Sequence, residues 1–354
     1  MNVLEKLVEK GFNITLVSPY DQYLDLVLDK IKVNYIPLKN LDRKSVNPIK
    51  EIALFFELRK LYKELKPDLV IHYTIKPNIY GNLAAWVSRI PSICVITGLG
   101  YVFLHDTIYN SMAKKLYKVS LNKAQLVIFE NHEDKDLFVQ LGLVKEDRSA
   151  IVNGCGINLE YFKPIYNPKD RDSKTIFTFV ARLIYDKGII EFVEAAKKIK
   201  ARYSNVEFWV AGEIDQGNPT SISNELLHKW VEEGTIKYFG HVRDVRTIIS
   251  KSDCVVLPSY REAMARTLTE ALAMERPVIS CDTSGCRSVV DDGVNGFLVP
   301  VKNVDALIEA IEKFSLMSEN SKQTMGKNGR KKAKNEFDDL IVTSQFLNLI
   351  DDVI

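Results

Sequence analysis

The sequence predicts an α/β protein with two domains, each built around a parallel sheet that is covered by helices. Three observations lead to this fold class. At 354 residues the chain is too long for one ordinary domain. Short apolar runs typical of buried strands alternate along the chain with amphipathic helices. Residues 163–173 are polar and contain two prolines, as expected of an interdomain linker.

The first domain is placed at residues 1–165. Its apolar spacing predicts a helix at residues 2–10, which Gly11 ends. Further strands are expected at 12–18, 33–37, 68–72, 92–96, 126–130 and 149–154, and helices at 49–65, 79–88, 107–124 and 133–141. The chain therefore opens on a helix and then a strand, whereas in a Rossmann-like half the first strand is central and precedes that helix. We expect that this first strand is absent, either because the chain is shortened by about twenty residues or because the sheet has a gap at its middle.

The second domain is placed at residues 166–335. Strands are expected at 176–181, 206–212, 236–240, 254–258 and 278–280, and helices at 189–200, 223–233, 245–250 and 304–314. The end of the chain is largely helical, and residues 336–354 are expected to form a helix that packs back on the first domain.

Composition excludes several classes of protein. The net charge of +2 is too small to give the whole surface a positive potential that would attract nucleic acid. Residues 1–166 carry 22 Lys and Arg against 18 Asp and Glu, while the remaining residues carry 26 against 28, so the first half is the better partner for an anionic surface. The five cysteines show no C-x-x-C spacing, which favours buried thiols in a reducing cytoplasm and indicates no metal site. We expect no signal peptide and no membrane-spanning helix.

The predicted helix at residues 107–124 is basic and amphipathic. Residues 107–129 contain no Asp or Glu, yet this stretch holds four lysines, and its apolar residues recur at helical spacing. Such a helix can lie on an anionic membrane surface. The alternative is a domain helix with solvated lysines and an apolar stripe in the core.

Two carboxylates stand out in the second domain. Glu262 follows a predicted strand, and Glu270 lies about two turns along the helix after it, so both can face one cleft. The helix amides near Thr267 and Leu268 suit an anion such as a diphosphate. Carboxylates beside an anion repel it unless they bind hydroxyl groups, and a ribose or a sugar has such groups. The alternative is that both carboxylates are solvated surface charges.

Two cations occupy the loop after the first strand of the second domain. Arg182 and Lys187 can neutralise a diphosphate, Arg182 as a planar fork and Lys187 as a point charge. In the first domain, Lys76 and Asn78 follow a predicted strand at the end where ligands bind in such sheets. The loop with Thr97 and Gly98 follows the next strand; this loop suits either a tight turn or close approach of a substrate.

The second half resembles the family 4 retaining glycosyltransferases of the GT-B fold. The matching segments are Val180-Ala-Arg-Leu with Asp186-Lys-Gly, Phe239-Gly-His-Val-Arg, Pro258-Ser-Tyr-Arg-Glu with Glu270-Ala-Leu-Ala and Pro277-Val-Ile, and Asn295-Gly-Phe-Leu-Val-Pro. They include the family's spacing of seven residues between the two glutamates. The resemblance implies two Rossmann-like domains that face a cleft.

The resemblance also implies roles for single residues. Arg182 and Lys187 would hold the donor diphosphate and Glu270 the ribose. Glu262 would bind hydroxyls of the donor sugar, and the backbone around Val242 would contact the base. Catalysis is expected at Glu262, Arg182 and Lys187 without metal or other cofactor, with a UDP-sugar as the donor substrate.

The segments Lys76-Pro-Asn and Thr97-Gly-Leu-Gly-Tyr are similar to the bacterial branch that acts on polyprenyl-diphosphate-linked sugars. This branch commonly uses UDP-N-acetylhexosamine donors in surface-polysaccharide or glycan assembly. Lys76, Asn78, Thr97 and Gly98 are therefore acceptor-site candidates, and Lys76 is expected to meet the acceptor diphosphate. The protein is expected on the inner face of the cell membrane, in peripheral contact through residues 107–124.

Two other functions stay open. A nucleotide-sugar epimerase of similar fold is one, although such enzymes lack this pair of glutamates. The other is a shortened chain that binds nucleotide without turnover. One departure from the family is Ala263, which stands where a glycine usually follows the first glutamate. The extra methyl group would tighten the approach of the backbone to the sugar.

Overall fold

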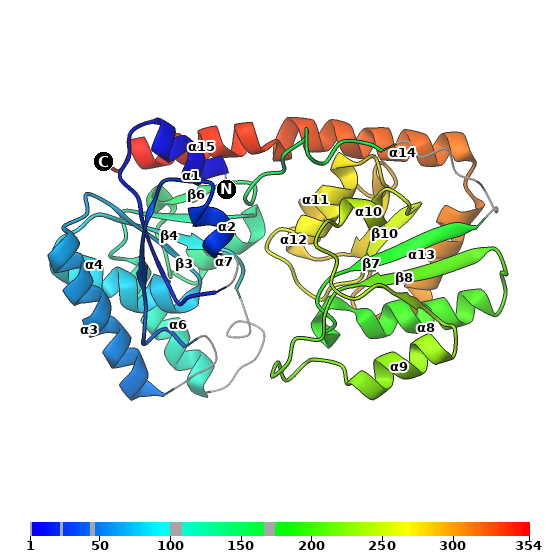
Figure 1. Ribbon diagram of the computed structural model, residues 1–354, viewed down its shortest axis with the longest axis horizontal. Helices are drawn as coiled ribbons and strands as arrows, with labels where there is room; N and C mark the ends of the chain where they lie inside the picture. The colour runs from blue at the N-terminus through cyan, green and yellow to red at the C-terminus, as the bar shows by residue number, and fades with distance from the viewer. Residues whose placement is uncertain (1, 22–23, 43–46, 100–107, 166–173) are drawn as a thin grey trace. The chain divides into compact units, whose positions relative to one another are not determined.

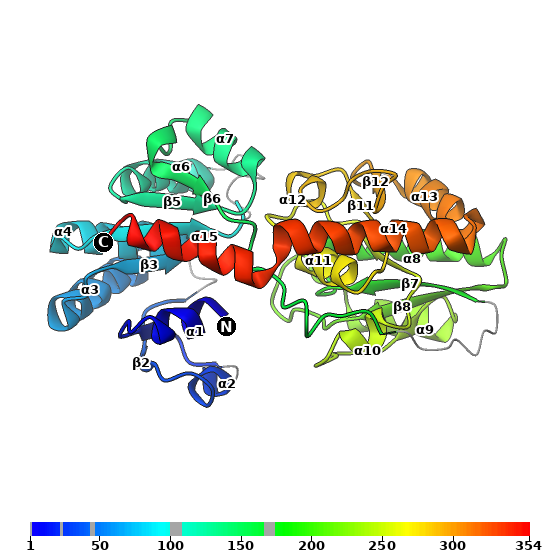
Figure 2. The same ribbon diagram turned by 90° about the horizontal axis from the view of Figure 1, so that it is seen from above.

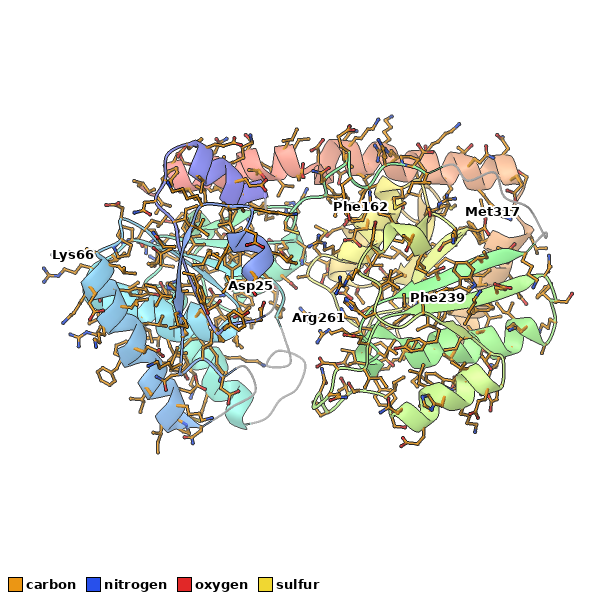
Figure 3. All side chains as sticks on the ribbon, in the orientation of Figure 1. Asp25, Lys66, Phe162, Phe239, Arg261 and Met317 are labelled. Atoms are coloured by element: carbon orange, nitrogen blue, oxygen red, sulfur yellow. The ribbon has the colours of Figure 1, made fainter. Side chains whose placement is uncertain are left out.

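The computed structural model describes residues 2–21, 24–42, 47–99, 108–165 and 174–354 (Figure 1). The chain forms two compact units. Unit 1 comprises Met1–Gly156 and Asp339–Ile354, and unit 2 comprises Ile157–Asp338. The sequence placed the boundary after residue 165, but the structure places it after Gly156. The reason is that Leu159 and Phe162 are buried in the core of unit 2, where Figure 3 labels Phe162. Most of the predicted linker, residues 166–173, lies outside the described residues.

Unit 2 contains a parallel sheet with the strand order β12-β11-β10-β7-β8-β9. The strands are β7 (Thr175–Val180), β8 (Val206–Ala211), β9 (Lys237–Tyr238), β10 (Cys254–Leu257), β11 (Val278–Cys281) and β12 (Gly296–Val299). The chain builds outward from β7 in one direction and from β10 in the other. The strand order therefore reverses between β7 and β10, and ligands bind in such sheets at the carboxyl ends of the strands beside this switch point.

Helices cover both faces of the sheet of unit 2. On one face lie α8 (Ile189–Lys200) and α13 (Val304–Leu316), which pack against each other. On the other, α11 (Arg266–Ala273) packs against α14 (Glu319–Lys332). The shorter elements are η3 (Tyr185–Lys187), α9 (Asn224–Glu232), α10 (Arg246–Ile249), α12 (Ser284–Arg287) and η4 (Ala333–Phe337). Central strands such as β10 are buried along their whole length, which explains their unbroken apolar sequence.

The strands of unit 1 form two separate parallel sheets. One pairs β1 (Thr15–Ser18) with β2 (Asn34–Pro37); the other has the order β3-β4-β5-β6, with β3 (Val70–Tyr73), β4 (Ser92–Ile96), β5 (Leu126–Phe129) and β6 (Ser149–Ile151). The hydrophobic core nevertheless crosses the break. Ile14 and Ile71 share one cluster, and Val17 and Val70 share another. The described residues thus show a break between these two sheets, which both alternatives for the missing first strand predict.

Helices also cover both faces of the four-stranded sheet of unit 1. On one face lie α1 (Asn2–Glu9) and the C-terminal helix α15 (Asp339–Asp351), where Leu7 and Phe346 meet Ile93 and Val95. Figures 1 and 2 show α15 beside α1. The opposite face carries α3 (Pro48–Leu65), η1 (Pro77–Gly81), α4 (Asn82–Ser88), α6 (Ile108–Leu121) and α7 (His132–Gln140). The remaining short elements are α2 (Leu24–Leu28) and η2 (Glu146–Arg148).

Candidate active site

Two loops meet at the switch point of unit 2. The first follows β7 and holds Arg182 and Lys187; the second follows β10 and holds Glu262. The carbonyl oxygen of Asp186 joins them, because it accepts hydrogen bonds from the Ser259 hydroxyl at 3.1 Å and from the Tyr260 amide at 2.9 Å. The parallel sheet therefore brings together side chains that are 75 residues apart in the chain.

Lys187 and Glu262 form an ion pair at this meeting point. The Lys187 Nζ lies 2.5 Å from Glu262 Oε1, and the two side chains are 20% and 11% exposed. The sequence predicted both residues as site residues but did not predict that they contact each other. Because the ammonium neutralises the carboxylate, Glu262 can stand beside an anion without repelling it strongly.

Glu270 is buried on the inner face of α11. Its carboxylate accepts a hydrogen bond from Arg266 Nε at 2.9 Å, one helical turn earlier. Burial raises the pKa of the Glu270 carboxyl, and the neighbouring Arg266 guanidinium opposes this rise. The second site carboxylate is therefore also paired with a cation, which the sequence analysis did not foresee.

The start of α11 lies against the end of β7. The Thr267 hydroxyl donates a hydrogen bond to the carbonyl oxygen of Val180 at 3.0 Å, so the helix begins beside the Arg182 loop. Leu268 is fully buried, and its amide donates to the carbonyl oxygen of Ala265 at 2.9 Å. The Leu268 amide is thus used within the helix, which differs from the expectation that it points at an anion.

Arg182 and Val242 lie on the loops after β7 and β9, two strands that both pair with β8. The Arg182 side chain is 46% exposed, and its Nη1 lies 2.6 Å from Asp215 Oδ2, on the loop after β8. Val242 is half-buried on the loop after β9. The Gly212 amide after β8 donates to the Gly240 carbonyl oxygen at 2.8 Å, which joins the loop after β8 to the loop of Val242.

In unit 1 the sequence-predicted acceptor residues follow β3 and β4. The Lys76 ammonium contacts Glu51 Oε1 at 2.5 Å and the carbonyl oxygen of Asp42, and its side chain is 14% exposed. Thr97 is exposed after β4, and Gly98 beside it has a φ of 121°. Lys76 and Thr97 thus both lie at the carboxyl ends of strands, as predicted, but Lys76 is held by an acidic partner.

The expectation for Asn78 needs correction. Asn78 is fully buried, its Nδ2 donates to the Val95 carbonyl oxygen at 2.9 Å, and its own carbonyl oxygen accepts from the Ser120 hydroxyl at 2.7 Å. These contacts fix the π-helical turn η1 to β4 and α6. A side chain without exposed surface cannot touch a bound saccharide in this conformation, so the contacts of Asn78 are structural. Asn78 directly precedes the helix predicted at residues 79–88 and Asn82 lies one turn further along; this spacing of two polar residues was the sequence signal for such a buried network.

In the described part of the chain, no group of three or more His, Cys, Asp or Glu side chains is placed to hold a metal ion. The charged residues on the two loops and on α11 beside this switch point are two cations, Arg182 and Lys187, and two carboxylates, Glu262 and Glu270. Such a set can bind a diphosphate through the cations and hydroxyl groups through the carboxylates.

Comparison with protein families agrees with this arrangement. Residues 165–332 match the family described as "Glycosyl transferases group 1", and residues 1–131 match "Glycosyl transferase 4-like". The match to the first family contains all the site residues of unit 2, from Arg182 to Glu270.

Individual proteins align along nearly the whole chain. The chain is 29% identical to the N,N'-diacetylbacillosaminyl-diphospho-undecaprenol alpha-1,3-N-acetylgalactosaminyltransferase of Campylobacter jejuni, over 100% of this chain and 95% of that protein. It is 27% identical to the UDP-Gal:alpha-D-GlcNAc-diphosphoundecaprenol alpha-1,3-galactosyltransferase of Escherichia coli, over 94% and 87%. A glycosyltransferase structure from Rickettsia africae superposes with a TM-score of 0.80 at 21% identity, over 99% of this chain and 93% of that one. This last likeness concerns the fold, which is GT-B.

Proposed function

The chain belongs to the group 1 glycosyltransferases of the GT-B fold, and on that premise we propose that it moves a sugar from a UDP-sugar to a polyprenyl-diphosphate-linked saccharide. The observation that carries this proposal is the ion pair between Lys187 and Glu262 at the switch point of unit 2, where the loop of Lys187 also carries Arg182. The two full-length relatives support the acceptor class, because both names contain an undecaprenyl-diphosphate-linked sugar. The donor sugar is an N-acetylhexosamine, as in the name of the first relative.

The donor is held by unit 2. Arg182 and Lys187 bind the diphosphate, and Glu270 accepts hydrogen bonds from the ribose hydroxyls. Glu262 faces the hydroxyls of the donor sugar, and the backbone around Val242 contacts the uracil. Each carboxylate already has a cation beside it, Lys187 for Glu262 and Arg266 for Glu270, which supports an arrangement where the carboxylates stand close to a diphosphate.

The transfer retains the configuration at the anomeric carbon. The bond between that carbon and the UDP oxygen breaks, and the acceptor hydroxyl oxygen bonds to the carbon on the same face. The proton of this hydroxyl passes to the departing UDP oxygen. Negative charge grows on the diphosphate as the bond breaks, so Arg182 and Lys187 contribute mainly by stabilising the leaving group.

The acceptor is an amphiphile, and unit 1 carries a surface suited to a membrane. Met112, Val119, Lys115 and Lys118 of α6 are all exposed, and α6 contains no acidic residue. On α3, the exposed apolar side chains Ile49, Ile52 and Phe56 lie at helical spacing. Both helices pack against η1, on the face of the sheet opposite to α15. Apolar side chains among lysines favour contact with an anionic lipid surface.

We therefore place the protein on the inner face of the cell membrane, in peripheral contact through residues 107–124 and α3. Among the described residues, no helix combines the length and the apolar character that crossing a bilayer requires. The contact is supported by the exposed side chains of α3 and α6 and by the nature of the acceptor. Residue 107, the first of the segment 107–124, lies outside the described residues.

The first experiment measures UDP release from a panel of UDP-sugars, with and without a polyprenyl-diphosphate-linked saccharide. Release that depends on the acceptor, with the sugar recovered on the lipid, is the expected result. Tight UDP binding without turnover would instead favour a protein that only binds nucleotide. Conversion of the donor sugar in the absence of acceptor would indicate an epimerase.

A further inference from the structure

We propose that Asp215 is a positioning residue of the donor site, which holds the Arg182 guanidinium ready for the diphosphate. This inference rests on the proposed function, because it concerns the same diphosphate. Asp215 lies on the loop after β8, and neither its position in the sequence nor the resemblance to the family pointed to it.

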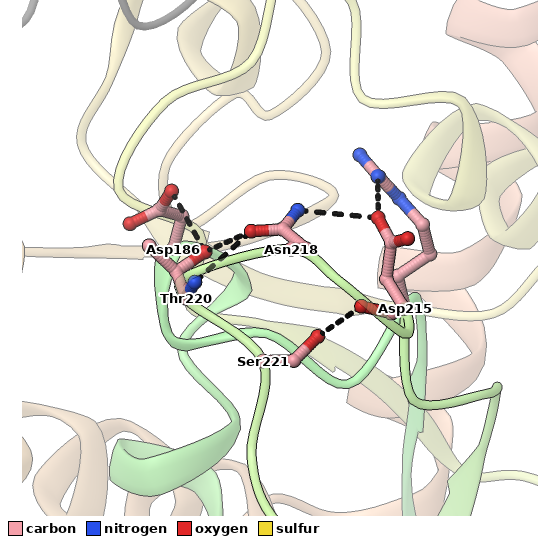
Figure 4. A network of polar contacts seen from close by, with 6 residues as sticks. Asp186, Asp215, Asn218, Thr220 and Ser221 are labelled. Carbon is pink, nitrogen blue, oxygen red and sulfur yellow. Dashed lines mark hydrogen bonds and ion pairs between the residues drawn. The ribbon is translucent and has the colours of Figure 1, made fainter. Parts of the chain in front are cut away.

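The contact between the two side chains is direct (Figure 4). Arg182 Nη1 donates to Asp215 Oδ2 at 2.6 Å, as a charge-assisted hydrogen bond. The Arg182 side chain is 46% exposed. A long side chain that is so exposed samples several rotamers unless a contact selects one, and here the carboxylate of Asp215 selects it.

Asp215 is itself fixed by its own loop. Its Oδ2 also accepts a hydrogen bond from Asn218 Nδ2 at 3.1 Å. Its carbonyl oxygen accepts bonds from the Ser221 hydroxyl at 2.7 Å and from the Asn218 amide at 2.9 Å. Backbone and side chain of Asp215 are therefore both held, and its carboxylate is a rigid anchor for Arg182.

The same loop continues to the second cation. Asn218 Oδ1 accepts hydrogen bonds from the Thr220 amide and hydroxyl, both at 3.0 Å (Figure 4). The Thr220 hydroxyl lies 3.4 Å from Asp186 Oδ2, and the Thr220 carbonyl oxygen accepts from the Tyr185 amide at 2.7 Å. Asp186 directly precedes Lys187. The loop after β8 thus supports both ends of the loop after β7, residues 181–188, which we call the cation loop. It thereby sets the spacing between Arg182 and Lys187.

A purely stabilising role explains these contacts less well. Ion pairs with solvent-exposed partners contribute only about 0–1 kcal/mol to folding, and Arg182 is such a partner. Positioning has a larger effect on binding and rate, because a shift of about 1 Å in a catalytic group costs up to about 100-fold. We therefore expect Asp215 to matter for the diphosphate and little for the fold.

The test compares affinity for UDP with affinity for uridine, which lacks the diphosphate. Asp215→Ala should weaken UDP binding about tenfold, the equivalent of one charge-assisted hydrogen bond. Uridine binding and the unfolding temperature should stay as in the unsubstituted protein. Asp215→Glu, which keeps the carboxylate on a longer stem, should recover part of the loss. Asp305→Asn, which removes an exposed ion pair with Lys198 elsewhere in unit 2, is the control and should change neither affinity.

A double-substitution cycle with Arg182→Ala gives the decisive result. Once Arg182 is removed, Asp215→Ala should have no further effect on UDP affinity. Equal UDP affinity in the single variant and the unsubstituted protein would overturn the inference, as would additive losses in the double variant or an equal loss for uridine. Failure of the unsubstituted protein to bind UDP would instead contradict the proposed function, so the two failures are distinguishable.

Discussion

Lys187 and Glu262 lie on the loops that follow the adjacent strands β7 and β10, and their charged atoms are 2.5 Å apart. The pair lies where the strand order of unit 2 reverses. A diphosphate that enters this site therefore finds a lysine whose ammonium is already oriented by a carboxylate. In the proposed function Glu262 binds hydroxyls of the donor sugar, and its contact with Lys187 would then link sugar recognition to stabilisation of the leaving group.

The first prediction separates the two partners of this pair. Glu262→Gln keeps the shape of the side chain but removes its charge, so UDP should still bind while the rate of transfer falls about 100-fold or more. Lys187→Met removes a cation from the diphosphate site and should weaken UDP binding as well as the rate. Calorimetric titration with UDP and acceptor-dependent UDP release measure the two effects. Equal loss of UDP affinity in both variants would contradict the distinction.

Both variants carry a possible cost to folding, since removal of one partner leaves a largely buried charge unpaired, at about 3–5 kcal/mol. Circular dichroism and thermal unfolding therefore accompany the assays. A variant that keeps the far-ultraviolet spectrum and a cooperative transition reports on the site, and one that does not is left out of the comparison.

The second prediction concerns pH and Glu270. Burial raises the pKa of this carboxyl above its ordinary value of 4.5, and ribose binding needs the ionised form. UDP affinity should therefore fall as the pH drops through the raised pKa. Because Arg266 opposes the rise, Arg266→Gln should move this fall to higher pH. Titrations with UDP across pH 4.5–8 measure it.

The contribution of Glu270 to the free energy of unfolding depends on pH in the opposite sense. A carboxyl whose pKa is higher in the folded protein binds protons more tightly there, so its contribution favours the folded state below pH 4.5 and is lost as the pH rises through the raised pKa. Glu270→Gln cannot ionise and should flatten both profiles in this window. Unchanged pH dependence in Glu270→Gln would assign the fall in affinity to another group.

The third prediction tests the close approach that positions the cation loop. Gly188 has a φ of 76°, and an added Cβ would lie 2.1 Å from the Pro258 carbonyl oxygen. Gly188→Ala should therefore lower the free energy of unfolding by several times the roughly 1–2 kcal/mol of left-handed backbone strain alone. Gly234→Ala is the matched control, because its φ is 65° and nothing lies within 4 Å of the added carbon. Similar decreases in the unfolding temperature of both variants would show that the backbone near Pro258 shifts to make room for the added carbon.

The sequence predicted the positions of the candidate residues of unit 2 in the fold, because these positions follow local patterns. Arg182, Lys187 and Glu262 lie on loops that follow apolar strands, and the rule for parallel sheets brings such loops to one edge. Lys76 and Asn78 follow the same pattern in unit 1, but the pattern says nothing about the partners that occupy them. The buried network around Asn78 and the ion pairs of Lys76 and Arg182 depend on contacts between distant segments. Single-sequence reasoning does not reach such contacts.

The fourth prediction decides whether Lys76 serves the acceptor or only the fold. Lys76→Met should raise the KM for the lipid-linked acceptor more than the KM for the UDP-sugar. Glu51→Gln removes the partner of Lys76 but keeps the ammonium, so it should leave the acceptor KM unchanged or lower it. Steady-state kinetics with both substrates varied give these values. An unchanged acceptor KM in Lys76→Met would leave Lys76 with a structural role only. The largely buried ion pair with Glu51 would then be that role.

The last prediction concerns the membrane surface of unit 1. Phe56 is 56% exposed on α3, one turn before the exposed Lys60, and Met112 is 58% exposed on α6, one turn before the exposed Lys115. If these side chains enter the lipid, Phe56→Ser with Met112→Ser should weaken sedimentation with phosphatidylglycerol vesicles at every salt concentration, since each lost apolar group costs about 1.5–3 kcal/mol. Lys115→Gln with Lys118→Gln should weaken it mainly at low salt, because screening already removes their contribution at high salt.

The control for that experiment removes the same charge elsewhere. Lys327→Gln with Lys331→Gln takes two exposed lysines from α14 of unit 2 and should leave vesicle binding unchanged. If it weakens binding as much as the α6 pair, the attraction is a property of total charge and not of this surface. Vesicles of phosphatidylcholine alone should bind the unsubstituted protein weakly, because apolar insertion then acts without the attraction between lysines and anionic lipids. Undiminished binding to these vesicles would show that insertion alone suffices and that the lysines serve another purpose.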